Sequence, residues 1–591
     1  MSSSVHSLFA VGQFVTETRE RLYRGMMVML LITASMSFYM ARLAHLQIVQ
    51  GAEHRQRAEE NRIRYIPLPS DRGKILDRNG KLLAANSLSR SLYLWPREQP
   101  KERWLTISAK LSTVLKIPKE EILQKLAKVD FNSTSPIRIA KNLSEAALVV
   151  LSERTEEFPG IEIRTEFTRD YPNGNLAAHV LGYIGEANQQ ELEANPRYPL
   201  GIKIGKMGIE KMLDNTIGGI WGTRAIEVNA IGEQLRVLKE RHPSSGESVR
   251  LTLDLELQKT AERALANRRG AVVVLDVKTG AVLAMASGPT FDPNMFARKM
   301  TQADWERLQS PDKPLLNRAL QGYPPGSTFK IVTSAAAMES DKFAPYSMLA
   351  TSNYITVGGF RFHEHSGGYG VIGFPKALAY SSNTFFYQMG LELGPEQIFQ
   401  WGHNLGIGKT TDLELLGLEG GMNGVIPTPK EKREWYGEPW YVGDTVSMAI
   451  GQGLVLSSPL ELAVMVASIA NGGYRVKPHL LADRTNTPAT KPVHTGMSPE
   501  TVAMIRQGLV AVVQKGTARS LNDASIPLTG GKTGTSEVTG QASHSLYVAF
   551  GAASKAEIAI AAIVENGGYG STAAAPIAKQ IFATYYKQKQ N

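Results

Sequence analysis

Cysteine is absent from the 591 residues of this sequence, and its absence removes a whole group of structures. Disulfide bonds and thiolate metal sites are excluded, and the composition is compatible with a location outside the cytosol. Dense runs of Lys and Arg interleaved with aromatic residues are also missing, although the formal net charge is +10. Nucleic acid is therefore not an expected partner, and an anionic surface such as a membrane or an acidic polymer fits the charge better.

Long hydrophobic runs are scarce too, because only residues 25–41 (GMMVMLLITASMSFYMA) form an uncharged stretch that approaches the width of a bilayer. No second long run follows, so we expect the chain to cross a membrane once at most. We predict a transmembrane helix over residues 23–46, preceded by a tail of residues 1–22, which the family resemblance described below would place in the cytoplasm. A buried core helix and a cleaved signal peptide are the alternatives, and the length of the run and the lack of an A-x-A site disfavour cleavage.

Charges near this run do not determine its orientation, because arginines lie on both sides of it. They are Arg19, Arg21 and Arg24 before the run and Arg42, Arg55, Arg57 and Arg62 after it. Most of the chain follows, and 43% apolar and 20% charged residues are typical of globular domains. A Pro/Ser/Gly linker, RHPSSGE, predicts a boundary between one domain over residues 47–245 and another over residues 246–591.

The tripeptide Lys-Thr-Gly occurs twice, and its surroundings distinguish the two copies. Residues 278–280 join two apolar, β-branched runs and are predicted to be a hairpin tip, where glycine suits the turn. The second copy lies in TGGKTGTSEV (529–538), before two apolar runs, SLYVAFGAA and EIAIAAIVE, that we predict to be adjacent antiparallel strands. Glycines around Lys532 would let a ligand approach this strand closely.

The stretch YPPGSTFKIVTSAAAMES (323–340) indicates a serine nucleophile. Pro-Pro-Gly ends the preceding element, so Ser327 is predicted at a helix start with Lys330 one turn away on the same face. A serine becomes nucleophilic when an adjacent base takes its proton, and a lysine with a lowered pKa can do this. The positive end of the helix dipole lies where an oxyanion would form.

A capping serine beside an unrelated lysine is the alternative interpretation. A second Ser-x-x-Lys, formed by Ser310 and Lys313, lies in a polar loop with no apolar helix after it, so the pattern alone has little specificity. Ser381-Ser382-Asn383 forms a polar trio inside an apolar stretch. The trio indicates either a helix end or a hydroxyl and an amide beside the serine–lysine pair.

Ser-x-x-Lys, Ser-x-Asn and Lys-Thr-Gly, in this order, are the three elements of the penicilloyl-serine transferases. From residues 25–41 to the C-terminus the chain resembles class B penicillin-binding proteins, the D,D-transpeptidases of peptidoglycan synthesis. RGKILDRNGKLLA, RDYPNGNLAAHVLGYIG and GKMGIE resemble signatures of their non-catalytic pedestal. Asn79-Gly80, in the first signature, predicts the two-residue turn of a β-hairpin. WYGEPWYVGDTVSMAIGQG and VENGGYGS are more similar to the cell-elongation type, penicillin-binding protein 2, than to the divisional type.

The resemblance implies an α+β fold: a membrane anchor, an elongated α+β pedestal (dimerisation-like) domain, and a transpeptidase domain with a mainly antiparallel sheet flanked by helices. The E-D-x-x-F-x-x-H-x-G pattern of a glycosyltransferase domain is not found. The implied reaction is acylation of Ser327 by a D-Ala-D-Ala stem peptide, with Lys330 as general base. Its pKa is expected to be lowered by nearby Lys532. Ser381 would relay a proton to the leaving D-Ala, and Asn383 would hold the substrate amide and Lys330.

The resemblance also implies the substrate-binding residues. Lys532, Thr533, Gly534 and Thr535 would bind the terminal carboxylate, and the backbone N–H groups of Ser327 and Thr535 would form an oxyanion hole. An amine of a neighbouring stem would then take the acyl group, and β-lactams would block Ser327 covalently. The nearest alternatives are a D,D-carboxypeptidase of the same superfamily and a protein that acts mainly as a scaffold for a glycan polymerase. A β-lactamase is disfavoured because it has no need of a pedestal or an anchor.

No cofactor and no metal is expected. Some relatives place zinc before Ser-x-Asn with cysteine among its ligands, whereas FRFHEHSGG offers only His363, Glu364 and His365. The implied partners are stem peptides of the lipid-linked precursor and the nascent glycan, β-lactams, the membrane, a SEDS-type glycosyltransferase and other elongation proteins. The implied location is the bacterial inner membrane, with the N-terminus in the cytoplasm and the catalytic domain outside it.

Overall fold

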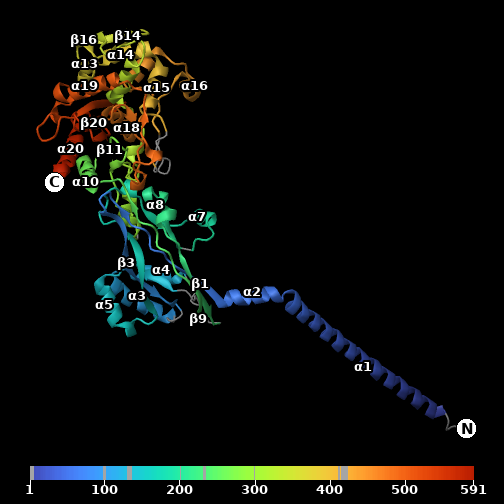
Figure 1. Cartoon of the computed structure of the whole chain (residues 1–591). Coiled ribbons are helices and arrows are strands. Elements are labelled where there is room, and N and C mark those ends of the chain that lie inside the picture. Colours follow the sequence, from blue (N-terminus) through green and yellow to red (C-terminus); the bar gives the residue numbers. More distant parts are fainter. Residues whose placement is uncertain are drawn as a thin grey trace.

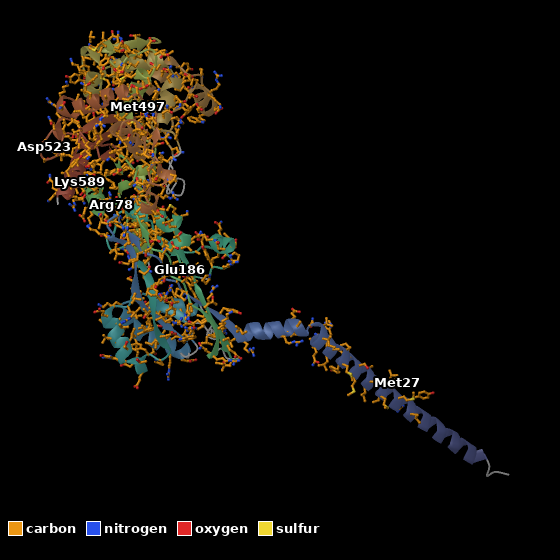
Figure 2. All side chains as sticks on the ribbon, in the orientation of Figure 1. Met27, Arg78, Glu186, Met497, Asp523 and Lys589 are labelled. Carbon is orange, nitrogen blue, oxygen red and sulfur yellow. The ribbon has the colours of Figure 1, made fainter. Side chains whose placement is uncertain are left out.

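The computed structural model describes residues 5–96, 101–128, 136–199, 201–229, 234–298, 300–409, 413 and 423–590. Figure 1 shows three parts in a row: a long N-terminal helix that projects away from the rest, a middle part, and a head formed by the C-terminal half. Figure 2 places Met27 on the projecting helix, Glu186 in the middle part and Met497 in the head. Both the middle part and the head contain helices and strands, which confirms the expected α+β architecture.

The projecting helix α1 (Val5–Ala44) continues through a π-helical turn (His45–Val49) into α2 (Gly51–Arg62). The 28 residues Leu22–Val49 run from α1 through the π-helical turn and have a mean hydropathy of 1.5. The rest of the protein does not bury their apolar side chains. At about 1.5 Å per residue, this stretch is longer than the roughly 30 Å hydrocarbon core of a bilayer. The helix is therefore long and apolar enough to be a membrane anchor. Residues 1–4 of the expected tail lie outside the described residues.

The middle part contains the first nine strands and α3 to α9. The strands are β1 (Ile63–Leu68), β2 (Ile75–Leu76), β3 (Leu82–Leu94), β4 (Ile137–Ala140), β5 (Ile161–Asp170), β6 (Ile184–Glu186), β7 (Lys203–Gly205), β8 (Gly222–Val228) and β9 (Gln234–Arg241). The helices are α3 (Lys101–Leu115), α4 (Lys119–Ala127), α5 (Glu145–Glu153), α6 (Ala178–Leu181), α7 (Gln189–Ala194), α8 (Gly208–Met212) and α9 (Asp214–Ile217). The long strand β3 pairs with β2, β4 and β5, while β1, β8 and β9 form a separate sheet near α2 (Figure 1).

The three N-terminal signatures meet at one buried ion cluster. Arg72 and Arg169 begin the first two signatures, and Glu210 ends GKMGIE. The Glu210 side chain is fully buried, with Arg169 Nε 2.7 Å from its Oε1 and Arg72 Nε 2.5 Å from its Oε2. Arg72 also contacts Asp214 Oδ1 at 2.7 Å. The cluster therefore ties together three segments that lie far apart in the sequence.

The first signature also joins the middle part to the head. β10 (Val249–Arg250) pairs in parallel with β2, and Arg78 N donates to the Leu253 carbonyl at 2.9 Å. The predicted two-residue turn is wrong, because the pairing resumes only after the five residues 77–81. Asp77 Oδ1 accepts from the backbone N–H of residues 79 and 81 and closes this longer loop, in which Gly80 takes a φ of 84°.

The head is built on the antiparallel sheet β12-β11-β21-β20-β19. Its strands are β11 (Gly270–Asp276), β12 (Val282–Gly288), β19 (Gly530–Val538), β20 (Gln541–Phe550) and β21 (Ile558–Val564). The helices are α10 (Leu255–Leu265), α11 (Gln302–Leu308), α12 (Lys330–Met338), α13 (Phe374–Tyr380), α14 (Asn383–Leu393), α15 (Pro395–Asn404), α16 (Pro429–Tyr436), α17 (Val442–Ala449), α18 (Pro459–Ala470), α19 (Pro499–Lys515) and α20 (Ala575–Gln590). The 3-10 turn η6 (Gly326–Phe329) precedes α12. Small hairpins pair β13 (Met348–Thr351) with β16 (Gly370–Gly373), β14 (Tyr354–Val357) with β15 (Phe360–His363), and β17 (Tyr474–Arg475) with β18 (Val493–His494).

Both faces of the head sheet are covered, which explains its continuous apolar strands. Val272 and Val274 belong to one apolar cluster together with residues of α10 and α20. The alternating residues Ala271 and Val273 belong to the other cluster, with α12 and α18. The two runs SLYVAFGAA and EIAIAAIVE form the antiparallel pair β20–β21, as predicted.

The first Lys-Thr-Gly is the predicted turn between β11 and β12. Asp276 Oδ1 accepts hydrogen bonds from Lys278 N at 3.0 Å, Thr279 N at 2.8 Å and Thr279 Oγ1 at 2.9 Å. Gly280 takes a φ of 80°, a region that favours glycine. Local backbone geometry therefore accounts for this copy.

Replacing Glu210 by alanine tests the ion cluster. Glu210→Ala leaves two buried guanidinium groups without their shared counter-charge, so we expect the middle part to lose about 3–5 kcal/mol of unfolding free energy. The control is Glu157→Ala, because Glu157 is about half exposed and forms a long surface ion pair with Lys110, at 3.7 Å. This variant should lose less than about 1 kcal/mol of unfolding free energy. Urea denaturation of the detergent-solubilised chain measures both. Equal, small losses in the two variants would contradict the structural role of Glu210.

Candidate active site

Ser327 lies in the tight turn that leads into α12, close to where it was predicted. Lys330 is the first residue of α12 and is fully buried. Gly326, with a φ of 52°, packs so tightly that a methyl group on it would lie 2.6 Å from the Thr535 carbonyl oxygen. Its N–H donates to the Gly451 carbonyl at 2.8 Å. Glycine before the serine therefore lets the segment that carries Ser327 touch strand β19.

Ser-x-Asn forms the joint between α13 and α14. Ser381 ends α13 in a left-handed conformation, with a φ of 57°. Ser382 caps α14, and its Oγ accepts from Phe385 N at 3.4 Å. The joint is thus a helix end and turn, and it also presents a hydroxyl and an amide to Lys330. The two interpretations that the sequence left open are both correct.

The three motifs converge on two buried amines. Lys330 Nζ lies 2.7 Å from Ser381 O, 2.7 Å from Asn383 Oδ1 and 3.3 Å from Ser381 Oγ. Lys532 Nζ lies 2.8 Å from the same Ser381 Oγ and 3.0 Å from Thr533 O. The Ser381 hydroxyl therefore lies within reach of both amines. It can pass a proton between Lys330 and a molecule bound beside Ser327.

Burial lowers the pKa of both lysines. It brings the pKa of Lys330 to about 7, against the charge of Glu364, which acts to raise it. Burial holds the pKa of Lys532 well below its usual value, and the positive charge of Lys330 lowers it further. Burial, not the charge of Lys532, is therefore the largest cause of the low pKa of Lys330, while the predicted repulsion between the two amines lowers the pKa of Lys532.

Strand β19 carries the second Lys-Thr-Gly. Thr533 and Thr535 face a cavity, and Thr533 Oγ1 is 2.6 Å from Thr517 Oγ1. Gly534 faces away from this cavity, since a methyl group on it would lie 2.9 Å from Thr328 Cγ2 and 3.0 Å from the Pro325 carbonyl oxygen. The structure thus gives Gly534 a packing function beneath η6, and its substrate-binding role stays a prediction.

The cavity in front of these motifs has a volume of about 760 Å³. It is lined by Ser327, His363, His365, Ser381, Asn383, Tyr387, Ser447, Ile450, Gln452, Gly453, Thr517, Thr533, Thr535, Glu537, Ser543, Tyr569, Gly570 and Ser571. Within the part of the chain that the structure describes, no hydrogen bond engages Ser327 Oγ, so this hydroxyl is available to a bound molecule. Lys330 and Lys532 lie buried behind the wall of the cavity.

Sequence reasoning missed several residues of this site. Gln452 and Tyr569 lie in stretches that indicated the family, but no role was assigned to them. Thr517 follows α19 and gave no sequence signal. Glu364 was considered only as a metal ligand, yet its buried carboxylate accepts hydrogen bonds from α14. A buried carboxylate at a helix start depends on tertiary contacts that one sequence does not display.

Two family models cover most of the chain. The model "Penicillin-binding Protein dimerisation domain" matches residues 67–251, which belong mainly to the middle part. The model "Penicillin binding protein transpeptidase domain" matches residues 270–583, which contain Ser327, Lys330, Ser381, Asn383 and Lys532.

Named relatives and solved structures agree with these models. The chain is 34% identical to peptidoglycan D,D-transpeptidase MrdA of Acinetobacter baumannii, over 96% of this chain and 88% of that protein. It is similar to the PBP2 of a PBP2–MreC complex from Helicobacter pylori, with a TM-score of 0.80, 28% identity, and 90% and 99% of the two chains covered. A chain of a peptidoglycan synthase complex gives a TM-score of 0.72 and 33% identity, with 95% and 98% covered. Matches over nearly the whole length, anchor and pedestal included, show that this chain belongs to the PBP2 (MrdA) family of class B penicillin-binding proteins, the peptidoglycan D,D-transpeptidases.

Proposed function

We propose that this chain crosslinks peptidoglycan during cell elongation, with Ser327 as nucleophile and Lys330 as its base. The convergence of Ser381 and Asn383 on Lys330, one turn from Ser327, carries the proposal, together with the contact of Lys532 with the same Ser381 hydroxyl. A lysine with a pKa of about 7 is partly neutral near neutral pH, so it can accept the serine proton.

The first step is acylation. Ser327 Oγ bonds to the carbonyl carbon of the penultimate D-Ala while its proton passes to Lys330 Nζ. The carbon–nitrogen bond to the terminal D-Ala then breaks, and that nitrogen takes the proton through the Ser381 hydroxyl. Free D-Ala leaves, and the stem remains bound to Ser327 as an ester.

The second step is aminolysis. An amine of a neighbouring stem attacks the ester carbonyl and gives a proton to Lys330 Nζ. The bond to Ser327 Oγ breaks, and the regenerated hydroxyl takes a proton back. A β-lactam acylates the same oxygen, but its ring nitrogen stays attached to the acyl group and does not depart as D-Ala does. The acyl-enzyme is therefore expected to be long-lived.

Charge on the substrate is met by fixed groups on β19 and η6. We assign binding of the terminal carboxylate to Thr533, Gly534 and Thr535, with Lys532 behind them. The backbone N–H groups of Ser327 and Thr535 are proposed to stabilise the oxyanion, which the tight packing of Gly326 on Thr535 supports. Asn383 would hold the substrate amide through its side chain.

The setting of the reaction is proposed from α1 and from the relatives. The anchor would lie in the bacterial inner membrane, with the N-terminus in the cytoplasm and the catalytic head in the periplasm or outside the cell. We propose the boundary between a pedestal over residues 47–245 and a catalytic domain over residues 246–591. An MreC-like protein and a SEDS-type glycosyltransferase are the proposed elongation partners, because relatives were solved in a PBP2–MreC complex and in a peptidoglycan synthase complex.

Covalent labelling identifies the nucleophile. We expect fluorescent penicillin to label the detergent-solubilised chain, and Ser327→Ala to abolish the labelling because no acyl acceptor remains. Ser310→Ala is the matched control, since Ser310 and Lys313 repeat the spacing outside the site, and it should label like the wild type. Labelling that survives in Ser327→Ala, or is lost in Ser310→Ala, would overturn the assignment of Ser327.

Product analysis separates the transpeptidase from the carboxypeptidase. With lipid-linked pentapeptide and an acceptor amine, we expect mass spectrometry to detect the crosslinked product together with released D-Ala. Ser327→Ala should form neither product. Release of D-Ala without crosslinked product, at an acceptor concentration that saturates the donor reaction, would favour the carboxypeptidase instead.

A further inference from the structure

Glu364 is a buried carboxylate directly behind Ser-x-Asn, outside the three motifs. It follows β15, and its side chain is fully buried. One carboxylate oxygen accepts from Asn383 N at 2.8 Å. The other accepts from Ser382 Oγ at 2.6 Å and from Thr384 N and Oγ1, each at 3.1 Å. Three consecutive residues at the start of α14 are therefore held by one side chain from another element.

Helix chemistry explains why a carboxylate suits this place. The first amides of a helix have no partner within the helix, and the helix dipole favours negative charge there. Burial acts to raise the pKa of Glu364, but hydrogen bonds from His365, Asn383, Ser382 and Thr384 outweigh it and bring the pKa to about 2. Glu364 is therefore ionised at neutral pH, and it binds α14 as an anion.

The residue before Glu364 fixes the Asn383 side chain. The His363 carbonyl accepts from Asn383 Nδ2 at 3.2 Å, which directs Asn383 Oδ1 to Lys330 Nζ at 2.7 Å. Glu364 N donates to the Asn353 carbonyl at 2.8 Å, so the base of the β14–β15 hairpin is itself held in place. Residues 363 and 364 thus clamp the backbone and the side chain of Asn383 from the same side.

We propose that Glu364 is a positioning residue, which locks the α13–α14 joint and so sets where Ser381 and Asn383 hold Lys330. The inference rests on the proposed function, in which Lys330 takes the serine proton. Glu364 lies behind the joint and acts through Ser382, Asn383 and Thr384.

The same carboxylate also affects the charge state of Lys330. Its negative charge raises the pKa of Lys330 against the effect of burial. The other charged or titratable groups around this centre include Lys532 from β19 and His365, whose Nδ1 lies 2.9 Å from Glu364 Oε1. They also include Tyr369 and Tyr387, whose pKa values are raised by burial and by the charge of Glu364. Removing the charge of Glu364 should therefore lower the pKa of Lys330 and make the neutral amine available at lower pH.

The test is the rate of Ser327 acylation by fluorescent penicillin between pH 5 and 9 in the full chain. In Glu364→Gln an amide N–H₂ faces backbone donors, so the plateau rate should fall about tenfold. The midpoint of the acid limb should at the same time move to lower pH than in the wild type. A purely structural role would lower stability without moving this midpoint.

Glu339→Gln is the matched control, because Glu339 also caps a helix from outside it. Its Oε1 accepts from Ser498 N at 2.7 Å and from Ser498 Oγ at 2.8 Å at the start of α19. We expect a lower melting temperature in this variant, with a rate within about twofold of the wild type and an unchanged midpoint. A shift of the midpoint in both variants would overturn the specific role of Glu364.

A folded Glu364→Gln protein with the wild-type plateau and midpoint would contradict the proposal. If Glu364→Gln does not fold, Thr384→Val decides, because it removes one donor to the carboxylate and keeps the charge. Its rate should fall about threefold with an unchanged midpoint, and a wild-type rate would contradict the proposal. Failure of the proposed function is distinguishable, since wild-type chain would then not be acylated at Ser327 at all.

Discussion

The structure of this site depends on one constraint: the amine of Lys330 is buried and must be held by oxygen atoms that belong to other elements. A buried amine without partners would cost several kcal/mol or lose its charge. Ser381 and Asn383 supply the acceptors, so α13 and α14 must meet in one fixed geometry. The left-handed Ser381, the cap at Ser382 and the anion of Glu364 all serve that joint. The same burial that demands these partners also brings the pKa of Lys330 near neutral, and this makes a lysine useful as a base.

Close backbone contact brings the remaining groups to this amine. Glycine at positions 326 and 534 lets η6 lie directly on β19, since even a methyl group there would overlap neighbouring backbone or side-chain atoms. Lys532, on β19, thereby reaches the same Ser381 hydroxyl that Lys330 contacts. In the pedestal, too, one buried charged group fixes several elements. Glu210 joins three distant segments through ion pairs with two buried arginines. The middle part that this cluster stabilises lies between the head and α1 (Figure 1).

Much of this arrangement was predictable from the sequence, because short motifs encode local geometry. The spacing of Ser327 and Lys330 predicted their common helix start, and the β-branched runs around residues 278–280 predicted a turn. Other features depend on tertiary contacts. The loop at residues 77–81 is longer than the Asn79-Gly80 pair suggests, because Asp77 accepts two backbone N–H groups. Glu364 resembled a poor metal ligand in sequence, and only its burial against α14 reveals its contacts. The origin of the low pKa of Lys330 likewise lies in burial, which neighbouring letters do not display.

The proposed mechanism depends on the charge state of Lys330, which can be measured in the intact protein. Nuclear magnetic resonance of the full chain with ¹³C-labelled lysine, assigned by comparison with Lys330→Arg, follows the Cε resonance of Lys330 as pH changes. If Lys330 is the buried base, its resonance should titrate with a midpoint near pH 7 while Ser327 is free. A resonance that stays in its protonated position up to about pH 10, as for an exposed lysine, would contradict it.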